Sequence, residues 1–263
     1  MEYSWIIQKK EGGVTKITLN RPRALNALNA AMIEEILDAV HKAAEDNEVK
    51  VLLLTGAGRA FCFGADISEF SEERVRSGGG CPETLLKKSQ EIIRRLTGMP
   101  KPTIAVLNGF ATGLGLDLAL ACDLRIAAAR AKLGEAFVSM GLVPDGGGTF
   151  FLPRMVGLAK AAEMIFTGAP IRASEALHLG LINKVLQAQE LEAYAQELAG
   201  KLAKGPSLAI GLAKQALWKN LLGDLSSALK LEAESQKVCL KSKDHREAVR
   251  AFREKRDPIF GGD

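Results

Sequence analysis

Short apolar runs and amphipathic stretches alternate along the first part of the chain. The runs at residues 5–9 and 14–19 flank Gly12 and Gly13, and this arrangement predicts a β-hairpin. Asn29 stands just before apolar residues at helical spacing, which indicates a capped helix. Runs typical of buried strands follow at 49–54, 102–106 and 124–128. We therefore expect strand and helix units of an α/β protein up to about residue 185.

The pattern changes near residue 190. Three helical stretches, near 190–204, 206–221 and 223–241, and a short one near 244–254 contain no good strand signal. We accordingly divide the chain into a core, 1–189, and a C-terminal helical region, 190–263. The apolar faces of these helices are typical of helices that pack on a core or on another subunit.

The most distinctive stretch is NGFATGLGLDLALACD, residues 108–123. Its glycines predict a tight turn, and the leucines after them indicate a buried helix. A strand that turns sharply into a helix leaves N–H groups unpaired at the positive helix end, which suits an oxyanion or a phosphate. Such turns are also common as plain connections. The stretch is neither a dinucleotide-binding fingerprint nor a P-loop, because Leu118 stands at the third glycine position and no Gly-Lys-Ser/Thr follows.

Composition excludes several classes of protein. The chain is 47% hydrophobic and 25% charged, and its 35 basic residues exceed its 31 acidic ones too slightly to indicate nucleic-acid binding. No apolar run reaches the roughly 20 residues of a membrane span, and the N-terminus lacks a secretory pattern. The four cysteines form no C-x-x-C pair, so we expect no metal site, no disulfide framework and a cytoplasmic location.

Two further segments are rich in glycine. Residues 72–82 are charged and contain three consecutive glycines, which predicts a mobile surface loop. Residues 146–148 are also three glycines, and they lead into a short apolar segment. This second turn directly follows Asp145, which between a proline and a glycine is an ordinary turn former.

Four stretches occur in a fixed order: NRPRALNAL, AFCFGADI, KPTIAVLNGFATGLG and FVSMGLVPDGGGTFFLPR. Together they resemble the crotonase superfamily, the enoyl-CoA hydratases and isomerases, and FREKRDPIF resembles that family's C-terminal end. The resemblance covers essentially the whole chain. It implies a spiral of ββα units with C-terminal helices that build a homotrimer or a dimer of trimers. It also implies an acyl-CoA substrate, with no metal and no cofactor beyond the CoA of the thioester itself.

The resemblance assigns binding roles to individual residues. In the family two backbone N–H groups bind the thioester oxygen, and by position these belong to Ala65 and Leu114. Leu114 stands where the family usually has a glycine. The backbone N–H donor is present with either residue. The family's CoA contacts carry over to Arg23, Ala24, Leu25, Ala60, Gly64, Asp66, Ile67, Phe252 and Lys255. The last two approach the nucleotide from the C-terminal end, often from a neighbouring subunit, although Lys255 is also explained as an ordinary surface lysine.

The acidic residues favour one reaction of the family. Family hydratases hold two glutamates around one water; the first aligns with Asp117, one methylene shorter, and the second with Phe137, which cannot transfer a proton. Asp145 resembles the aspartate of enoyl-CoA isomerases of the phenylacetate-degradation type, which shuttles a proton along the acyl chain. We expect Glu135 to face the site only if the strand register slips.

We therefore expect an enoyl-CoA isomerase with Asp145 as its principal acid and base. Asp117 is either a second catalytic participant or a residue that orders the loop. Two other functions stay open: hydration of a 2-enoyl-CoA with Asp117 as acid/base, and a catalytically inactive CoA-binding subunit. Nucleic-acid binding, known for some relatives, has no support here because no arginine-rich run with interleaved aromatics exists. We expect no membrane partner.

Overall fold

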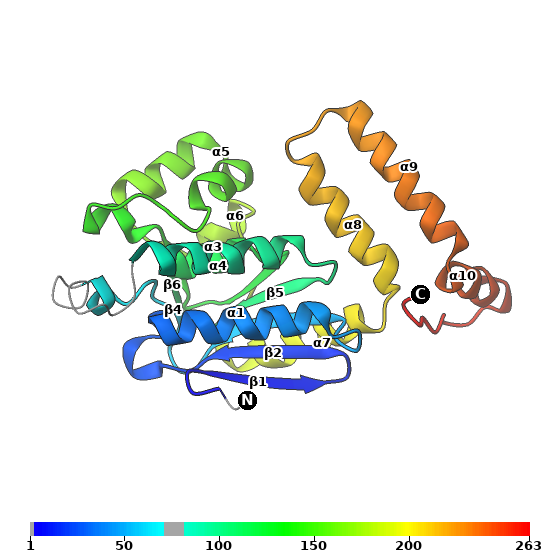
Figure 1. The fold of residues 1–263 in the computed structure, drawn as a ribbon, viewed down its shortest axis with the longest axis horizontal. Helices are drawn as coiled ribbons and strands as arrows, with labels where there is room; N and C mark the ends of the chain where they lie inside the picture. Colours follow the sequence, from blue (N-terminus) through cyan, green and yellow to red (C-terminus); the bar gives the residue numbers. More distant parts are fainter. Residues whose placement is uncertain (1–2, 71–81) are drawn as a thin grey trace.

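Two β-sheets wrapped by helices form the part of the chain that the computed structural model describes, residues 3–70 and 82–263 (Figure 1). The predicted loop at 72–82 lies outside the described residues except for its last residue, Pro82. Among the helices in these two ranges, none combines the length and the apolar character needed to cross a membrane.

The larger sheet has the strand order β1-β2-β3-β5-β7-β10. The predicted hairpin is confirmed, since β1 and β2 pair antiparallel around Gly12 and Gly13. From β2 onward the pairs are parallel, and parallel neighbours need crossover connections, which the helices supply. The bounds are β1 Ile6–Glu11, β2 Val14–Leu19, β3 Val51–Gly56, β5 Thr103–Leu107, β7 Leu124–Ala128 and β10 Lys184–Leu186.

Successive residues of β3 enter two different apolar layers. Leu52 and Leu54 pack with the layer formed by α1 (Ala30–Glu45), α3 (Pro82–Gly98) and α4 (Leu114–Leu120). Val51 and Leu53 pack with α7 (Ala188–Ala203) on the other face. A parallel sheet covered on both faces explains why these strands are continuous apolar runs in the sequence.

The smaller sheet has the order β4-β6-β8-β9, with bounds β4 Ala60–Cys62, β6 Phe110–Thr112, β8 Lys132–Gly134 and β9 Ile171–Arg172. Each of β4, β6 and β8 follows soon after β3, β5 and β7, and each is followed in turn by helical structure. The chain thus repeats a ββα unit, and the predicted crotonase-like fold is confirmed.

The remaining helices connect or extend these units. They are the 3-10 helices η1 (Pro22–Ala24), η2 (Ile67–Phe70) and η3 (Ala136–Met140), and the α-helices α5 (Gly148–Thr167), α6 (Ala173–His178), α8 (Ser207–Asn220), α9 (Leu225–Lys241) and α10 (Lys243–Glu254). Gly157 has non-helical dihedral angles and bends α5 into two parts.

The predicted boundary between the core and the C-terminal region lies inside a helix. The boundary between residues 189 and 190 falls within α7, which covers one face of the larger sheet and so belongs to the core. Lys214 of α8 is buried and ties that helix to the core: its Nζ donates to the carbonyl oxygen of Leu96 at 2.7 Å and pairs with Asp123 at 2.8 Å. Beyond α8, α9 and α10 lie apart from the sheets, on the right of Figure 1.

Candidate active site

One buried amide fixes the loop formed by residues 20–28. The Oδ1 of Asn26 accepts from the N–H of Arg21 at 2.9 Å, and its Nδ2 donates to the carbonyl oxygens of Ala57 at 2.9 Å and Ala60 at 2.8 Å. Leu25 and Asn26 both have left-handed φ values, 52° and 58°, which side-chain-bearing residues rarely adopt. The amide of Asn26 therefore holds the loop in a conformation that the backbone alone disfavours.

This loop lies directly against the turn that contains Ala65. The N–H of Leu28 donates to the carbonyl oxygen of Gly64 at 2.8 Å, and Arg21 forms an ion pair with Asp66 at 2.9 Å. Two predicted groups of CoA contacts thus adjoin each other in one chain. They are Arg23, Ala24 and Leu25 on the loop, and Gly64, Asp66 and Ile67 on the turn.

Three other predicted CoA contacts occupy different settings. Ala60 is fully buried in β4, where its carbonyl oxygen accepts from the side chains of Asn26 and Asn108. Phe252, 86% exposed, and Lys255 lie on and just after α10, far across the molecule from β4 and β6 (Figure 1). Within one chain, these two residues lie away from the turns that carry Ala65 and Leu114.

The turns that carry Ala65 and Leu114 abut each other. A Cβ on Gly64 would stand 3.8 Å from the backbone nitrogen of Leu114. Leu114 is the first residue of α4, and neither its N–H nor that of Ala65 donates a hydrogen bond to another described group. Gly115 permits this close approach, because a Cβ there would stand 2.4 Å from the carbonyl oxygen of Cys62. Unpaired N–H groups on adjoining turns are the arrangement that an oxyanion hole requires.

An apolar ring borders the second turn. Phe137, only 9% exposed, lies beside Gly113: a Cβ on that glycine would stand 3.6 Å from the ring. An aromatic side chain therefore lies next to the turn that carries Leu114.

Three carboxyl groups gather around the turn at 146–148. Asp117, one turn into α4, is fully buried, and its Oδ2 accepts from the N–H of Gly146 at 3.1 Å. Asp145 is half-buried, and Gln90 of α3 donates to its carbonyl oxygen at 3.1 Å. Glu135 is fully buried, and Gly148 lies against both its carboxyl group and that of Asp117.

All three acids are harder to ionise than free carboxyls. Burial raises the pKa of Asp117, and the nearby Asp145 raises it further. Burial likewise raises the pKa of Glu135, with added repulsion from Asp117 and Asp145. Burial raises the pKa of Asp145 as well. Groups with raised pKa values in one cluster suit proton transfer near neutral pH.

The expectation for Glu135 was wrong. Its side chain reaches the cluster without any slip of register, because strand β8 ends at Gly134 and Glu135 is the residue that precedes η3. The two-residue alternation of a strand, on which the expectation rested, does not apply beyond Gly134.

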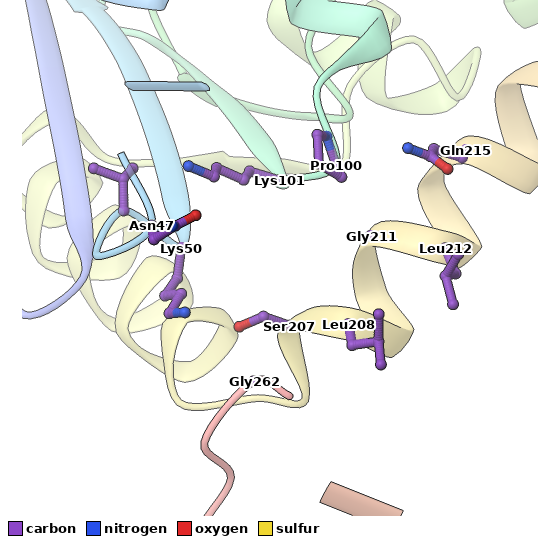
Figure 2. Close-up of a pocket in the computed structure, with 11 residues that line it drawn as sticks. Asn47, Lys50, Pro100, Lys101, Ser207, Leu208, Gly211, Leu212, Gln215 and Gly262 are labelled. Carbon is purple, nitrogen blue, oxygen red and sulfur yellow. The ribbon is translucent and has the colours of Figure 1, made fainter. Parts of the chain in front are cut away.

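A separate cavity of about 320 Å³ lies at the amino ends of strands β3 and β5 of the larger sheet (Figure 2). Lys50 and Lys101, which precede β3 and β5, line one side of it, and Ser207 and Leu208 of α8 line the other. Ligands of parallel sheets bind beyond the carboxyl ends of the strands, where the carboxyl cluster and both turns lie. This cavity is therefore not part of the candidate active site.

In the described ranges, no group of three His, Cys, Asp or Glu residues could hold a metal ion.

Comparison with known proteins agrees with this geometry. Residues 9–263 match the family described as Enoyl-CoA hydratase/isomerase. A short-chain-enoyl-CoA hydratase of Clostridium acetobutylicum is 40% identical over 257 residues, which cover 97% of each protein. A 1,2-epoxyphenylacetyl-CoA isomerase of Escherichia coli is 38% identical over 258 residues, which cover 98% of each. The crystal structure of an enoyl-CoA hydratase from Bacillus anthracis matches with a TM-score of 0.92 and 37% identity, covering 99% of this chain and 100% of that one.

The fold and the site define an α/β enzyme that pairs two backbone N–H donors with a carboxyl cluster. The chain belongs to the enoyl-CoA hydratase/isomerase family, the crotonase superfamily. Because hydratases and an isomerase resemble it to nearly the same degree, the choice of reaction rests on the residues of its own site.

Proposed function

We propose that this protein is an enoyl-CoA isomerase that moves a double bond between the 3,4 and 2,3 positions of an acyl-CoA. The observation that carries the proposal is the pairing of Asp145 with Phe137. Asp145 is a half-buried carboxyl that aligns with the base of the isomerases this chain resembles. Phe137 is a buried aromatic ring that aligns with the second carboxylate of the hydratases.

The reaction needs one base and two hydrogen-bond donors. Asp145 takes a proton from C2 of the 3-enoyl thioester, and the negative charge moves onto the thioester oxygen. The N–H groups of Ala65 and Leu114 donate to that oxygen, and each such donor contributes roughly 3–4 kcal/mol to catalysis. Asp145 or Asp117 then returns a proton at C4, which leaves the double bond between C2 and C3. No proton is gained or lost overall.

Phe137 favours this outcome over hydration. Hydration needs a water molecule that is held and activated beside the double bond, ordinarily by two carboxylates. An apolar ring next to the oxyanion-hole turn offers that water no hydrogen bond and tends to exclude it. The enolate is then free to be protonated on carbon.

Hydration of a 2-enoyl-CoA is the second candidate function. Asp117 supports it, because this carboxyl aligns with the first glutamate of the hydratases and its pKa is raised by burial, as a general acid requires. Similar proteins that carry the name hydratase, at 40% and 39% identity, support it too.

A comparison of rates on matched 3-enoyl and 2-enoyl thioesters tests the proposal. Wild type is expected to isomerise the 3-enoyl ester faster than it hydrates the 2-enoyl ester. Asp145→Asn keeps the size of the side chain but removes the base, so isomerisation should fall at least about a hundredfold. Asp117→Asn should cost less. Glu197→Gln, an exposed change on α7, is the matched control and should have no effect.

Two outcomes of this comparison would overturn the proposal. Faster hydration by wild type, or full activity of Asp145→Asn, would assign the chemistry to Asp117 and a hydratase. Absence of any proton exchange on either thioester, with acyl-CoA still bound by EDTA-treated protein, would identify a CoA-binding subunit without activity.

The site is proposed to be completed by a homotrimer or a dimer of trimers. No residue of α9 is buried in the single chain, and Leu225 of that helix is 75% exposed. Apolar faces of this kind mark interaction surfaces, and Phe252 and Lys255 reach an acyl-CoA only across such a contact. Light scattering should therefore give a multiple of the 28.2 kDa chain mass; a stable monomer would contradict the proposal.

A further inference from the structure

Glu135 is a buried acid for which the proposed reaction has no use. It is fully buried, and neither of its carboxyl oxygens has a hydrogen-bond partner among residues 3–70 and 82–263. The Oδ1 of Asp117 lacks one in the same ranges. Buried polar atoms are nearly always paired, so these oxygens require an explanation.

The two acids approach each other across a glycine. A Cβ on Gly148 would stand 2.8 Å from the Oδ1 of Asp117 and 2.8 Å from the Oε1 of Glu135. The absent side chain thus leaves a space into which two unpaired oxygens project. A proton held between them would satisfy both atoms at once.

The described surroundings offer no cation that would let both acids ionise. Asp117 is the only charged residue of α4, and the segment before α5 adds a third acid, Asp145. On α5, Arg154 stacks on the ring of Phe150 and Lys160 pairs with Glu163 and Glu175. On β8, Lys132 lies over the ring of Phe110, and the partly exposed Lys88 of α3 pairs with Glu34. Two adjacent buried carboxylates without a cation are strongly disfavoured, so the pair retains a proton.

We propose that Glu135 is a positioning residue for catalysis: its carboxyl shares a proton with Asp117 and keeps Asp117 in the form that can donate to the substrate. The second carboxyl that Phe137 replaces is thus supplied from two positions earlier, beside Asp117. This inference rests on the proposed role of Asp117 in returning the proton. The proton that Asp145 takes from C2 restores the pair after each turnover, so the protons balance.

The variant Glu135→Gln tests the inference through the pH dependence of kcat. The amide of glutamine can donate to an ionised Asp117 but cannot share a titrating proton with it. Asp117 should therefore lose its proton at lower pH. The alkaline limb should move down by about one pH unit or more, and kcat near pH 8 should fall about tenfold with little change in KM.

Controls separate this role from a purely structural one. A residue that only fills space would change the yield or the thermal stability of the protein and leave the alkaline limb where it is; that result would overturn the inference. Glu197→Gln is the matched exposed control. If wild type hydrates rather than isomerises, the pH dependence of kcat is measured for hydration instead. Failure of the proposed isomerase reaction therefore does not decide whether Glu135 shares a proton with Asp117.

Infrared titration of the protein without substrate gives a second readout. Wild type should retain the carbonyl band of a protonated carboxylic acid at and above neutral pH. Asp117→Asn should shift or weaken that band, and Glu135→Gln, if it folds, should do the same. A wild-type spectrum without such a band, or one that Asp117→Asn leaves unchanged, would overturn the inference even if Glu135→Gln cannot be purified.

Discussion

The two glycine-rich turns of the site use glycine for opposite purposes. In the turn at 109–115, Gly115 lets the backbone of α4 press against β4, and the N–H of Leu114 is left without a partner. In the turn at 146–148, Gly146 and Gly148 lie against side-chain oxygens of Asp117 and Glu135. One turn thus brings backbone donors forward, and the other makes room for acids.

This difference explains why glycine content alone says little about chemistry. Both turns precede a helix, and both contain a glycine with positive φ. Only their surroundings distinguish a turn that stabilises negative charge from one that accommodates carboxyl groups with raised pKa values. Substitutions that remove a donor from the first turn, or space from the second, should therefore have different consequences.

The largest effect is expected from Leu114→Pro. Leu114 is the first residue of α4, where proline is tolerated because its missing N–H has no partner in the helix. The substitution deletes one donor to the thioester oxygen and no hydrogen bond of the fold. We expect kcat to fall about 100- to 1,000-fold while the protein stays folded, as measured by steady-state kinetics and circular dichroism.

Leu114→Ala is the matched control for that donor. It keeps the N–H and shortens the side chain, so kcat should stay within a few-fold of wild type. If proline and alanine at this position give the same activity, the amide of Leu114 does not hold the thioester oxygen.

A smaller effect is expected from Gly148→Ala in the second turn. The new Cβ would stand 2.8 Å from oxygens of both Asp117 and Glu135 and would force the two side chains apart. Because these atoms are the ends of movable side chains, the stability loss should be only about 1 kcal/mol. Activity should fall about tenfold, as a disturbed proton-sharing pair implies.

Gly200→Ala supplies the comparison, since a Cβ there meets no atom within 4 Å. This change within α7 should be neutral or stabilise by up to about 1 kcal/mol. Urea unfolding and turnover measured on both variants would show whether Gly148 serves the acids. Equal activity of Gly148→Ala and Gly200→Ala would mean that it does not.

The last of these effects concerns stability as a function of pH. The pKa values of Asp117 and Glu135 are higher in the folded protein than in the unfolded chain. At a pH between the unfolded and the folded pKa values, the folded protein therefore binds more protons. Stability from these groups is therefore greatest below about pH 4 and is lost as pH rises through the folded pKa values. We expect the acids to lower the free energy of unfolding by about 1–3 kcal/mol between pH 5.5 and pH 8.

Urea unfolding of wild type and Asp117→Asn at both pH values isolates this contribution from that of other groups. Asparagine carries no charge, so the variant should lose less stability than wild type over the interval and be the more stable of the two at pH 8. Parallel pH dependences in the two proteins would show that Asp117 is not held protonated.

Much of the fold was predictable because its signals are local. The hairpin around Gly12 and Gly13 and the apolar runs of β3, β5 and β7 follow from periodicity, and the structure confirms them. The boundary near residue 190 stays a prediction, and it falls inside α7 because a helix signal does not reveal what the helix packs against. Leu191, Ala195 and Ala199 of α7 bury themselves on the larger sheet.

The carboxyl cluster was only partly predictable. Asp117 and Asp145 stand in motifs that resemble a known family, whereas Glu135 was expected to follow the register of a strand. The end of that strand at Gly134 and the 3-10 turn after it decide where Glu135 points. The contact between residues 18 positions apart in sequence depends on tertiary packing, which no local pattern encodes.

The loop that Asn26 holds restricts how this protein can vary. The position needs one acceptor for the N–H of Arg21 and donors for the carbonyl oxygens of Ala57 and Ala60, all on a side chain of one length. Aspartate offers no donor, leucine offers neither, and glutamine is a methylene too long for the same space. An evolutionary change of Asn26 therefore requires simultaneous changes in the two backbone segments that its side chain joins. Slow deamidation of the same amide in an ageing molecule would have the effect of the aspartate substitution.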